Sequence, residues 1–573
     1  MFNTYPYHDT LIIVHGKHTI KTGGEVRWQQ ENVRFQFTEA GNMLFTGNFT
    51  GNGLADFLLG ESVSFTYGSL KRDVLGQRWK DFSLFGQDDY KVTSKLTLNL
   101  GFRWEYATPM IDKYGQTSTV FIDKLPTFGV PGSGVATTVL AGDKSRGLCD
   151  KCGYFPDKRG FQPRLGFAYD VFGNGKWAVR GGYGIFFAEF GSNLVLQNLL
   201  QPPFTTFPTV TDSGGVGFVS LANPTCGGTC VPPGTGLVVV TDPHIRTSYM
   251  QQYNLNLQHD LGAGFLLEAG YVGTLGRKLL NFRDLNQPFV VSVNGQPPSE
   301  ANLEQRRPFA GFGDIFRSSS WANSSYSGLV TSINKRFSNG YTFLTGYTWS
   351  KCIDQASQFH SGGGSVIDPF VPQNEYNPAA ERGLCAFDVR HRFTFIGSME
   401  LPFGSGKRFL DNEGLTDKLV GGWRMSPILV LSHGVPLTVR DNSDPCLTRI
   451  PFFASCRPNR VGDPNLDNRS PNNWINKAAF QVQPLGTFGT AGRGILFADG
   501  TENFDLNFAK FTSITERTNF EFRAEFYNLF NHPQFGVPDL DFSAGNNPNF
   551  GKIFSTARFT NAREIQFGMK LYF

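Results

Sequence analysis

The residues in this sequence that could do enzyme chemistry are few, and their spacing completes no catalytic or metal-binding motif. The segment "FGSGKR" at residues 403–408 contains part of a phosphate-binding loop, but it lacks the upstream spacing and the Ser or Thr that follows the lysine. "GSG" at residues 132–134 lacks the strand-turn-helix context of a nucleophile elbow. His15 and His18 in "HGKH" would point to opposite sides of a continuous strand, so we expect no metal site there. The sequence therefore predicts a turn at 403–408, no enzyme activity and no cofactor.

The eight cysteines form a second group of reactive side chains, and all of them lie in or beside segments rich in Gly and Pro. An even number of cysteines in loops favours disulfide bonds and an oxidising compartment. The alternative is a zinc site, because "CDKC" and "CGGTC" each hold two cysteines at a short spacing. We favour disulfides because of the loop context and because Cys352 and Cys385 close one loop. The candidate disulfide residues are Cys149, Cys152, Cys226, Cys230, Cys352, Cys385, Cys446 and Cys456.

Charged residues alternate with apolar ones in two segments, "LTLNLGFRWEY" and "NFEFRAEF". In an extended strand these charges share one face, and inside a barrel they would face the lumen. There they could hold a plug or line a substrate path. The competing interpretation, which we favour, is a structural network of hydrated charges paired across strands. The candidate lumen-facing residues are Arg103, Glu105, Glu521, Arg523 and Glu525.

The same alternation extends along the whole chain and indicates many long strands. The 573 residues include 66 Gly and 56 Phe, and aromatic residues make up 14%, yet the mean hydropathy is -0.24. No run approaches the roughly 18 apolar residues of a membrane-spanning helix. About 15 segments alternate with period two, and many are long enough to cross a bilayer as tilted strands of about 9 to 11 residues. The net charge of +4 and the lack of a basic run argue against a nucleic acid partner.

Short and long connections alternate between these segments. The short turns are "TSK", "GNG", "LGAG", "SNG" and "TER", and the long connectors are residues 108–160, 191–246, 279–324, 353–386, 438–501 and 532–562. The connection at 403–420 is an exception, because it is long although its place in the alternation requires a short turn. Every second connection of an up-and-down barrel emerges on the same side, as in outer-membrane barrels. The sequence predicts an all-β fold, an antiparallel transmembrane β-barrel of about 15 to 16 strands with short periplasmic turns and long extracellular loops.

The final segment, "NAREIQFGMKLYF", predicts a last strand with one apolar face toward lipid, formed by Ile565, Phe567, Met569, Leu571 and Phe573. If the turn at "TER" is periplasmic, the strand that follows it runs outward and the last strand runs back to the periplasmic rim. We expect it to close the barrel, because closure leaves no unpaired sheet edge in lipid.

Six segments in matching order resemble the barrel of Oar-like TonB-dependent receptors. They are "FQPRLGFAYDVFGNGKWAVRGGYGIFF", "YVGTLGRKLL", "SYSGLVTSINKRFSNGYTFLTGYTWSKCID", "DVRHRFTFIGSMELPFG", "NFDLNFAKFTSITERTNFEFRAEFYNLFNHPQFGVP" and "NAREIQFGMKLYF". The resemblance implies energised uptake of a bulky solute, such as an oligosaccharide or peptide, across the cell outer membrane. It also implies that Phe567, Met569, Leu571 and Phe573 belong to a signal read by the outer-membrane assembly machinery.

The sequence departs from this family in its organisation. Such receptors have a signal peptide, a plug that contacts TonB and a 22-stranded barrel, whereas no signal, plug or TonB box is recognisable here and the strands are too few. We therefore expect residues 1–573 to be the barrel of an N-terminally truncated receptor, with TonB a partner only through the missing plug and outer-membrane lipid around the barrel. Two other functions stay open, namely a passive porin-like channel and a structural or adhesion protein of the surface. A soluble sandwich or propeller fits the strand lengths and the asymmetric loops poorly.

Overall fold

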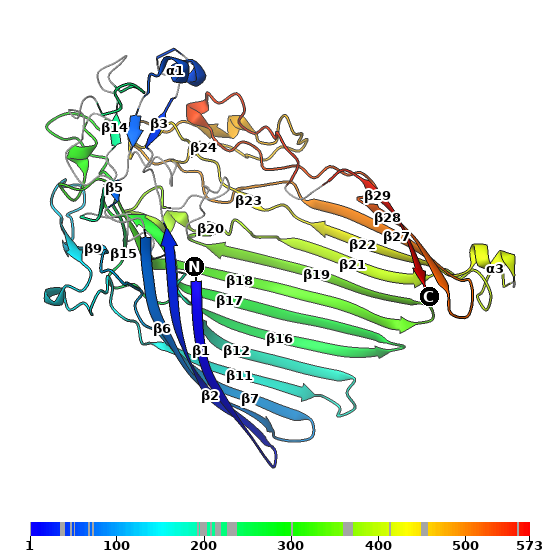
Figure 1. The fold of residues 1–573 in the computed structure, drawn as a ribbon. Coiled ribbons are helices and arrows are strands. Elements are labelled where there is room, and N and C mark those ends of the chain that lie inside the picture. The colour runs from blue at the N-terminus through cyan, green and yellow to red at the C-terminus, as the bar shows by residue number, and fades with distance from the viewer. Residues whose placement is uncertain are drawn as a thin grey trace.

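The computed structural model describes most of the chain (Figure 1). Its description leaves out residues 1, 35–40, 46–48, 51, 63, 67–68, 71–73, 192–193, 195–202, 207–208, 212–218, 226–237, 300–301, 359–370, 412–413, 449–455 and 558–560. In the part of the chain that is described, no helix has both the length and the apolar character needed to cross a membrane.

One sheet of 18 strands dominates the structure. Three of its strands are short, β8 (Ile111–Asp112), β15 (Val238–Thr241) and β20 (Gly383–Leu384). The other fifteen are β1 (Phe2–His15), β2 (His18–Arg34), β6 (Val74–Lys91), β7 (Leu96–Ala107), β11 (Gly160–Asp170), β12 (Trp177–Phe187), β16 (Tyr249–Gly262), β17 (Phe265–Asp284), β18 (Ile315–Ser338), β19 (Tyr341–Asp354), β21 (His391–Glu400), β22 (Trp423–Ser432), β27 (Thr501–Ser513), β28 (Asn519–Tyr527) and β29 (Glu564–Tyr572). The predicted all-β fold is confirmed.

The remaining elements are short and lie in the connections. The strands are β3 (Asn42–Leu44), β4 (Ser64–Thr66), β5 (Ser69–Leu70), β9 (Ser118–Lys124), β10 (Val135–Leu140), β13 (Thr205–Thr206), β14 (Thr209–Thr211), β23 (Pro436–Leu437), β24 (Asn459–Arg460), β25 (Phe480–Gln481) and β26 (Leu496–Phe497). The helices are α1 (Gly53–Leu59) and α3 (Leu415–Val420), with 3-10 turns at Lys144–Arg146, Glu304–Arg306, Pro378–Glu381, Lys477–Ala479 and Ser543–Gly545.

Each long strand pairs antiparallel with the next one along the chain, from β1 to β29. Short turns join successive strands at one end of the sheet, for example residues 16–17, 339–340 and 514–518, and long connectors lie at the other end (Figure 1). This alternation confirms the predicted up-and-down order. The exception at residues 403–420 is real, because this connection at the turn end folds into turns and the helix α3.

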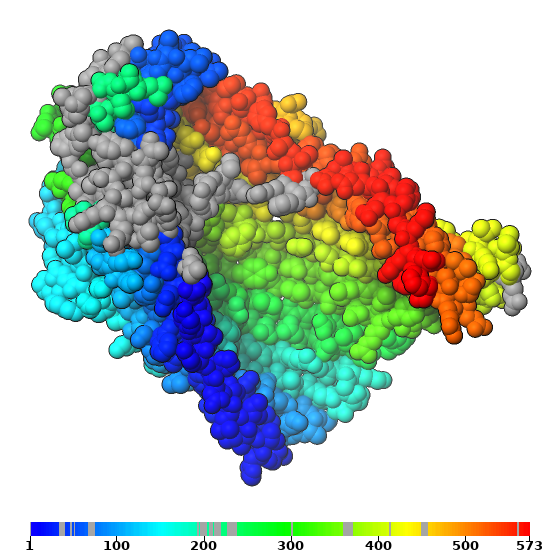
Figure 2. All heavy atoms as spheres, viewed as in Figure 1, coloured from blue at the N-terminus to red at the C-terminus, as the bar shows by residue number. Residues whose placement is uncertain are grey.

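The sheet is open, so the expectation that the last strand closes the barrel is wrong for the described residues. The long strand β1 pairs with β2, and β29 pairs with β28, but β1 and β29 do not pair with each other. Both strands run from the connector end to the turn end, so their direct contact would be parallel. Figure 2 shows the resulting gap, which opens between β1 and β29 onto a hollow lined by the middle strands of the sheet.

The two faces of the sheet differ in chemistry. On one face, large apolar side chains such as Leu100, Phe102 and Leu165 are exposed. The opposite face carries polar and charged residues, because side chains alternate along each strand and cross-strand partners share a face. An exposed apolar face of this extent is typical of strands that contact lipid.

The long connectors pack on one another into a folded cap at one end of the sheet. A cluster of twelve buried apolar residues joins the connector between β22 and β27 to the one between β28 and β29, with Trp474, Phe480 and Phe542 among its members. Two smaller clusters join the connectors that follow β7, β12 and β17. Strands β3 and β4 of one connector pair with each other, and β4 also pairs with β14 of another connector. The cap therefore has its own apolar cores.

Candidate functional site

The five charged residues predicted from alternation lie on one face of the sheet. Directly opposed residues on antiparallel strands point to the same side of a sheet. When the partners are traced strand by strand from β7 to β28, the charged residues of β7 and those of β28 fall on the same side. They are nevertheless separated into two groups on opposite flanks of the sheet, and the structure does not bring the groups together. The first group is Arg103 and Glu105, and the second is Glu521, Arg523 and Glu525.

Both groups consist of local ion pairs. The Nε atom of Arg103 donates to Oε1 of Glu105 at 2.5 Å, and the amide of Gln162 donates to Oε2 of the same carboxylate at 2.5 Å. On β28, the Arg523 guanidinium lies 3.3 Å from Glu521 and 3.5 Å from Glu525. Each carboxylate in these contacts has a nearby cation, and the side chains are partly exposed except that of Glu521, which is buried. The charges in both groups are therefore paired locally.

The apolar row of the last strand lies on the opposite face of β29. Phe567, Met569, Leu571 and Phe573 all have more than half of their surface exposed. The ring of Phe567 stacks against that of Phe522 on β28, with 6.2 Å between the ring centroids. The row is thus presented outward as one apolar strip at the turn end of the sheet.

Six of the eight cysteines are joined in the structure. The disulfides are Cys149–Cys152, Cys352–Cys385 and Cys446–Cys456, with Cα–Cα distances of 5.2, 5.4 and 6.0 Å. Cys352 lies on β19 near its cap end, so its bond to Cys385 ties the sheet to the connector before β21. The remaining candidates, Cys226 and Cys230, lie outside the described residues.

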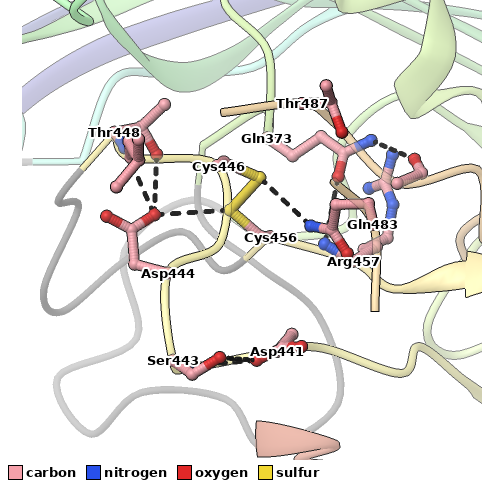
Figure 3. Close-up of a disulfide and its surroundings, with 12 residues drawn as sticks. Gln373, Asp441, Ser443, Asp444, Cys446, Thr448, Cys456, Arg457, Gln483 and Thr487 are labelled. Carbon is pink, nitrogen blue, oxygen red and sulfur yellow. Dashed lines mark hydrogen bonds between the residues drawn. A yellow bond between two sulfur atoms is a disulfide. The ribbon is translucent and has the colours of Figure 1, made fainter. Parts of the chain in front are cut away.

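The surroundings of the Cys446–Cys456 disulfide contain a buried network that alternation did not reveal (Figure 3). The amide of Gln483 lies against the sulfur of Cys446, with 3.6 Å between the nitrogen and the sulfur. The backbone N–H of Arg457 donates to the side chain of Gln373 at 3.1 Å, and the amide of Gln373 donates to the carbonyl of Gly489 at 3.1 Å. These bonds connect two cap connectors that are far apart in the sequence.

Two arginines in this network are fully desolvated. The two terminal nitrogens of the Arg457 guanidinium donate to the carboxylate of Glu381, at 2.6 and 3.0 Å, and both side chains are only 2% exposed. Arg493 donates to Asp354 at 3.1 Å and to the backbone carbonyl of Glu381 at 2.6 Å. Because Asp354 is the last residue of β19, these contacts fix the cap to the sheet. No sequence signal identified these residues, since they stand alone in connectors without periodicity.

A second buried carboxylate, Glu375, is also held in the cap. The carboxylate lies 2.6 Å from the Arg283 guanidinium, while its Oε2 atom has no hydrogen-bond partner among the described atoms. Burial raises the pKa of Glu375 to about 7, and Arg283 opposes this shift without cancelling it.

This raised pKa predicts that the cap loses stability as the pH rises. The folded state binds the proton more tightly than the unfolded state, so the contribution of Glu375 is present below its ordinary pKa of 4.5 and is lost as the pH approaches about 7. We expect a loss of about 2 to 3 kcal/mol over that range. Hydrogen exchange of residues 371–377, corrected for the intrinsic rate, measures it. Glu375→Gln should remove the dependence, and an unchanged pH profile in this variant would contradict the assignment.

The two histidines of "HGKH" lie on the same face, contrary to the prediction from a continuous strand. The turn at residues 16–17 separates β1 from β2, and His15 and His18 are direct cross-strand partners. Nδ1 of His18 lies 2.7 Å from a carboxylate oxygen of Asp88 on β6. No set of three or more His, Cys, Asp or Glu side chains in the described ranges is placed to hold a metal ion.

A match to one protein family agrees with this architecture. A sequence model for an outer membrane beta barrel domain matches residues 1–566, whereas no curated protein matches the chain. Solved structures that align with it include the outer membrane transporter YddB from Escherichia coli (TM-score 0.49, 10% identity, 100% of this chain and 54% of that chain). Another is the ferripyoverdine receptor of the outer membrane of Pseudomonas aeruginosa bound to ferripyoverdine (TM-score 0.45, 10% identity, 100% and 48%).

The chain spans about half the length of these solved structures. The family match is much more extensive, because it covers nearly every residue from the first strand to the last. The chain belongs to the outer membrane beta barrel domain family and resides in the outer membrane.

Proposed function

We propose that this chain is the barrel part of an Oar-like TonB-dependent transporter that takes up a bulky solute, such as an oligosaccharide or a peptide. The proposal rests on the six motif segments that resemble this family and on the open sheet. In this assignment the polar face lines the solute path, the cap connectors capture the solute, and the rest of the receptor, including the plug that contacts TonB, is supplied by residues outside 1–573.

The directions of the two edge strands carry the proposal. Because β1 and β29 run the same way, an all-antiparallel barrel needs an odd number of further strands between them. A second copy of this chain in the same membrane orientation has edge strands that run in the same direction as β1 and β29. It therefore cannot pair with them in an antiparallel way. A barrel of 22 strands, as in plugged transporters, meets this requirement, because the fifteen long strands of this chain leave an odd number of strands to be added. Unpaired edges in lipid are costly, which favours such a completion.

Uptake measurements in the native organism test this proposal. We expect deletion of the gene to reduce uptake of labelled oligosaccharides or peptides, and a protonophore or a TonB deletion to reduce uptake to the same level. A passive porin-like channel would instead give uptake that depends on the gene but not on the protonophore. A gene product without any effect on solute uptake would contradict transport altogether.

A further inference from the structure

A small cavity lies on the polar face of the sheet beside the cap. It is partly enclosed and is lined by β2, β6 and β7, by the first residue of β11 and the last residue of β12, and by residues next to β11, β12 and β16. Its volume is about 40 Å³. Cross-strand pairing places Ser83 between Glu25 on β2 and Glu105 on β7, so the three side chains share the polar face. Gly160 permits close approach here, because a Cβ atom at this position would lie 1.9 Å from the carbonyl oxygen of Glu105.

The charge in this cavity is unbalanced. Five carboxylates line it, from Glu25, Asp81, Glu105, Asp157 and Glu189, and Arg27 is the sole cation among the described lining residues. Two of the five have cations elsewhere, because Glu105 pairs with Arg103 at 2.5 Å and Asp157 pairs with Arg159 at 2.8 Å.

The other three carboxylates converge on Arg27. The guanidinium lies 3.8 Å from Glu25 and 3.6 Å from Asp81, and it also contacts Glu189. One cation shared among three carboxylates leaves an excess of negative charge at the wall of a partly enclosed space. Such an excess attracts a cationic group, since the low-dielectric surroundings strengthen the attraction.

Ser83 supplies an independent indication of a ligand. The residue is only 7% exposed, and its hydroxyl has no hydrogen-bond partner among the described atoms. Buried polar groups in folded proteins are almost always paired, so an unpaired hydroxyl at a cavity wall indicates a missing partner. A serine hydroxyl can accept a hydrogen bond from a cationic N–H group while the carboxylates accept the others.

We propose that this cavity binds the primary ammonium group of an amino-bearing solute. An ammonium group has three donors, which match the Ser83 hydroxyl and the Glu25 and Asp81 carboxylates in number. A cavity of about 40 Å³ has room for a group of that size, because about 10 to 15 Å³ of such space is enough to hold one water. The site lies on the polar face next to the cap, where a solute arriving from the connectors would meet it. This binding goes beyond the proposed uptake and needs neither TonB nor a plug.

Calorimetric titration of the purified chain in detergent micelles tests the site with 1,5-diaminopentane as the probe and 1,5-pentanediol as its neutral analogue. We expect saturable binding of the diamine and none of the diol. Glu25→Gln should weaken binding about tenfold, because it removes a charged acceptor. Ser83→Ala should weaken it about threefold and leave folding intact, since its hydroxyl has no bond to lose within the protein.

Glu268→Gln is the matched control, because Glu268 is an exposed carboxylate of the polar face on β17, outside the cavity lining. This variant should bind the diamine as the unchanged protein does. Equal weakening by Glu268→Gln and Glu25→Gln would show general attraction to a negative wall, which would overturn the site. Absence of saturable binding, or equal binding of the diol, would overturn it as well. None of these results depends on energised uptake, so the two proposals fail separately.

Discussion

Phe522→Lys should strongly impair insertion of the chain into the outer membrane. Phe522 lies on the apolar face of β28, where its ring stacks on Phe567 of the last strand. A lysine on the lipid face costs about 2 to 4 kcal/mol near the bilayer midplane, because its charge loses water without gaining a partner. Phe567→Asp should impair insertion in the same direction, although acidic residues cost less. The fraction of chain that becomes resistant to urea extraction from isolated outer membranes measures the effect.

Arg523→Gln is the matched control for this prediction, because it changes the next residue of the same strand on the opposite face. Arg523 contacts Glu521 and Glu525 at 3.3 and 3.5 Å, and its side chain is 43% exposed. Such exposed pairs contribute at most about 1 kcal/mol, so assembly should be retained. If Phe522→Lys, Phe567→Asp and Arg523→Gln assemble equally well, the apolar face of β28 and β29 does not contact lipid.

The long strands could be predicted from the sequence because alternation is a local signal. A strand with one face toward lipid and one toward water repeats every two residues, and segments such as 96–107 and 519–527 show this directly. Closure is a different kind of property. It depends on whether the edges of β1 and β29 meet in space and run in opposite directions, and neither strand's own pattern contains that information.

The wrong prediction that His15 and His18 lie on opposite faces has a similar origin. Period two places these residues on opposite faces only while the strand continues, and a turn of two residues reverses the chain between them. Gly16 adopts a φ of 57°, which suits a tight turn of this kind. The pair "GK" is a weak turn signal, so alternation alone does not predict the hairpin of β1 and β2.

The cavity and the cap could not be predicted, because their residues meet through pairing between distant segments. Ser83 and Glu25 are ordinary strand residues until the register sets them side by side. Glu381 and Arg457 belong to connectors rich in Gly and Pro, where no periodicity relates a position to a face. Only the packing of those connectors brings the two charges within 3 Å of each other.

Arg457→Met should destabilise the cap by about 3 to 5 kcal/mol, because it leaves the Glu381 carboxylate buried without its cation. The same packing that excludes water from this pair makes the remaining charge costly. Hydrogen exchange of residues 433–448 and 456–500 should accelerate, while exchange in the long strands stays unchanged, since the ion pair lies outside the sheet. The double variant Arg457→Met with Glu381→Met should recover most of the protection, because apolar replacement of a whole buried pair is often nearly neutral.

Arg146→Met provides the comparison that separates burial from charge. Arg146 pairs with Asp123 at 2.5 Å, a contact as short as that of Arg457, but both side chains are partly exposed. Its removal should therefore cost less than about 1 kcal/mol. Similar losses from Arg146→Met and Arg457→Met would mean that the Arg457 site is hydrated and that the cap is held together by its apolar clusters alone. A large loss from Arg457→Met with recovery in the double variant would instead identify the desolvated pair as a specific tie between the connectors, whose rigidity keeps the proposed capture surface in place above the hollow.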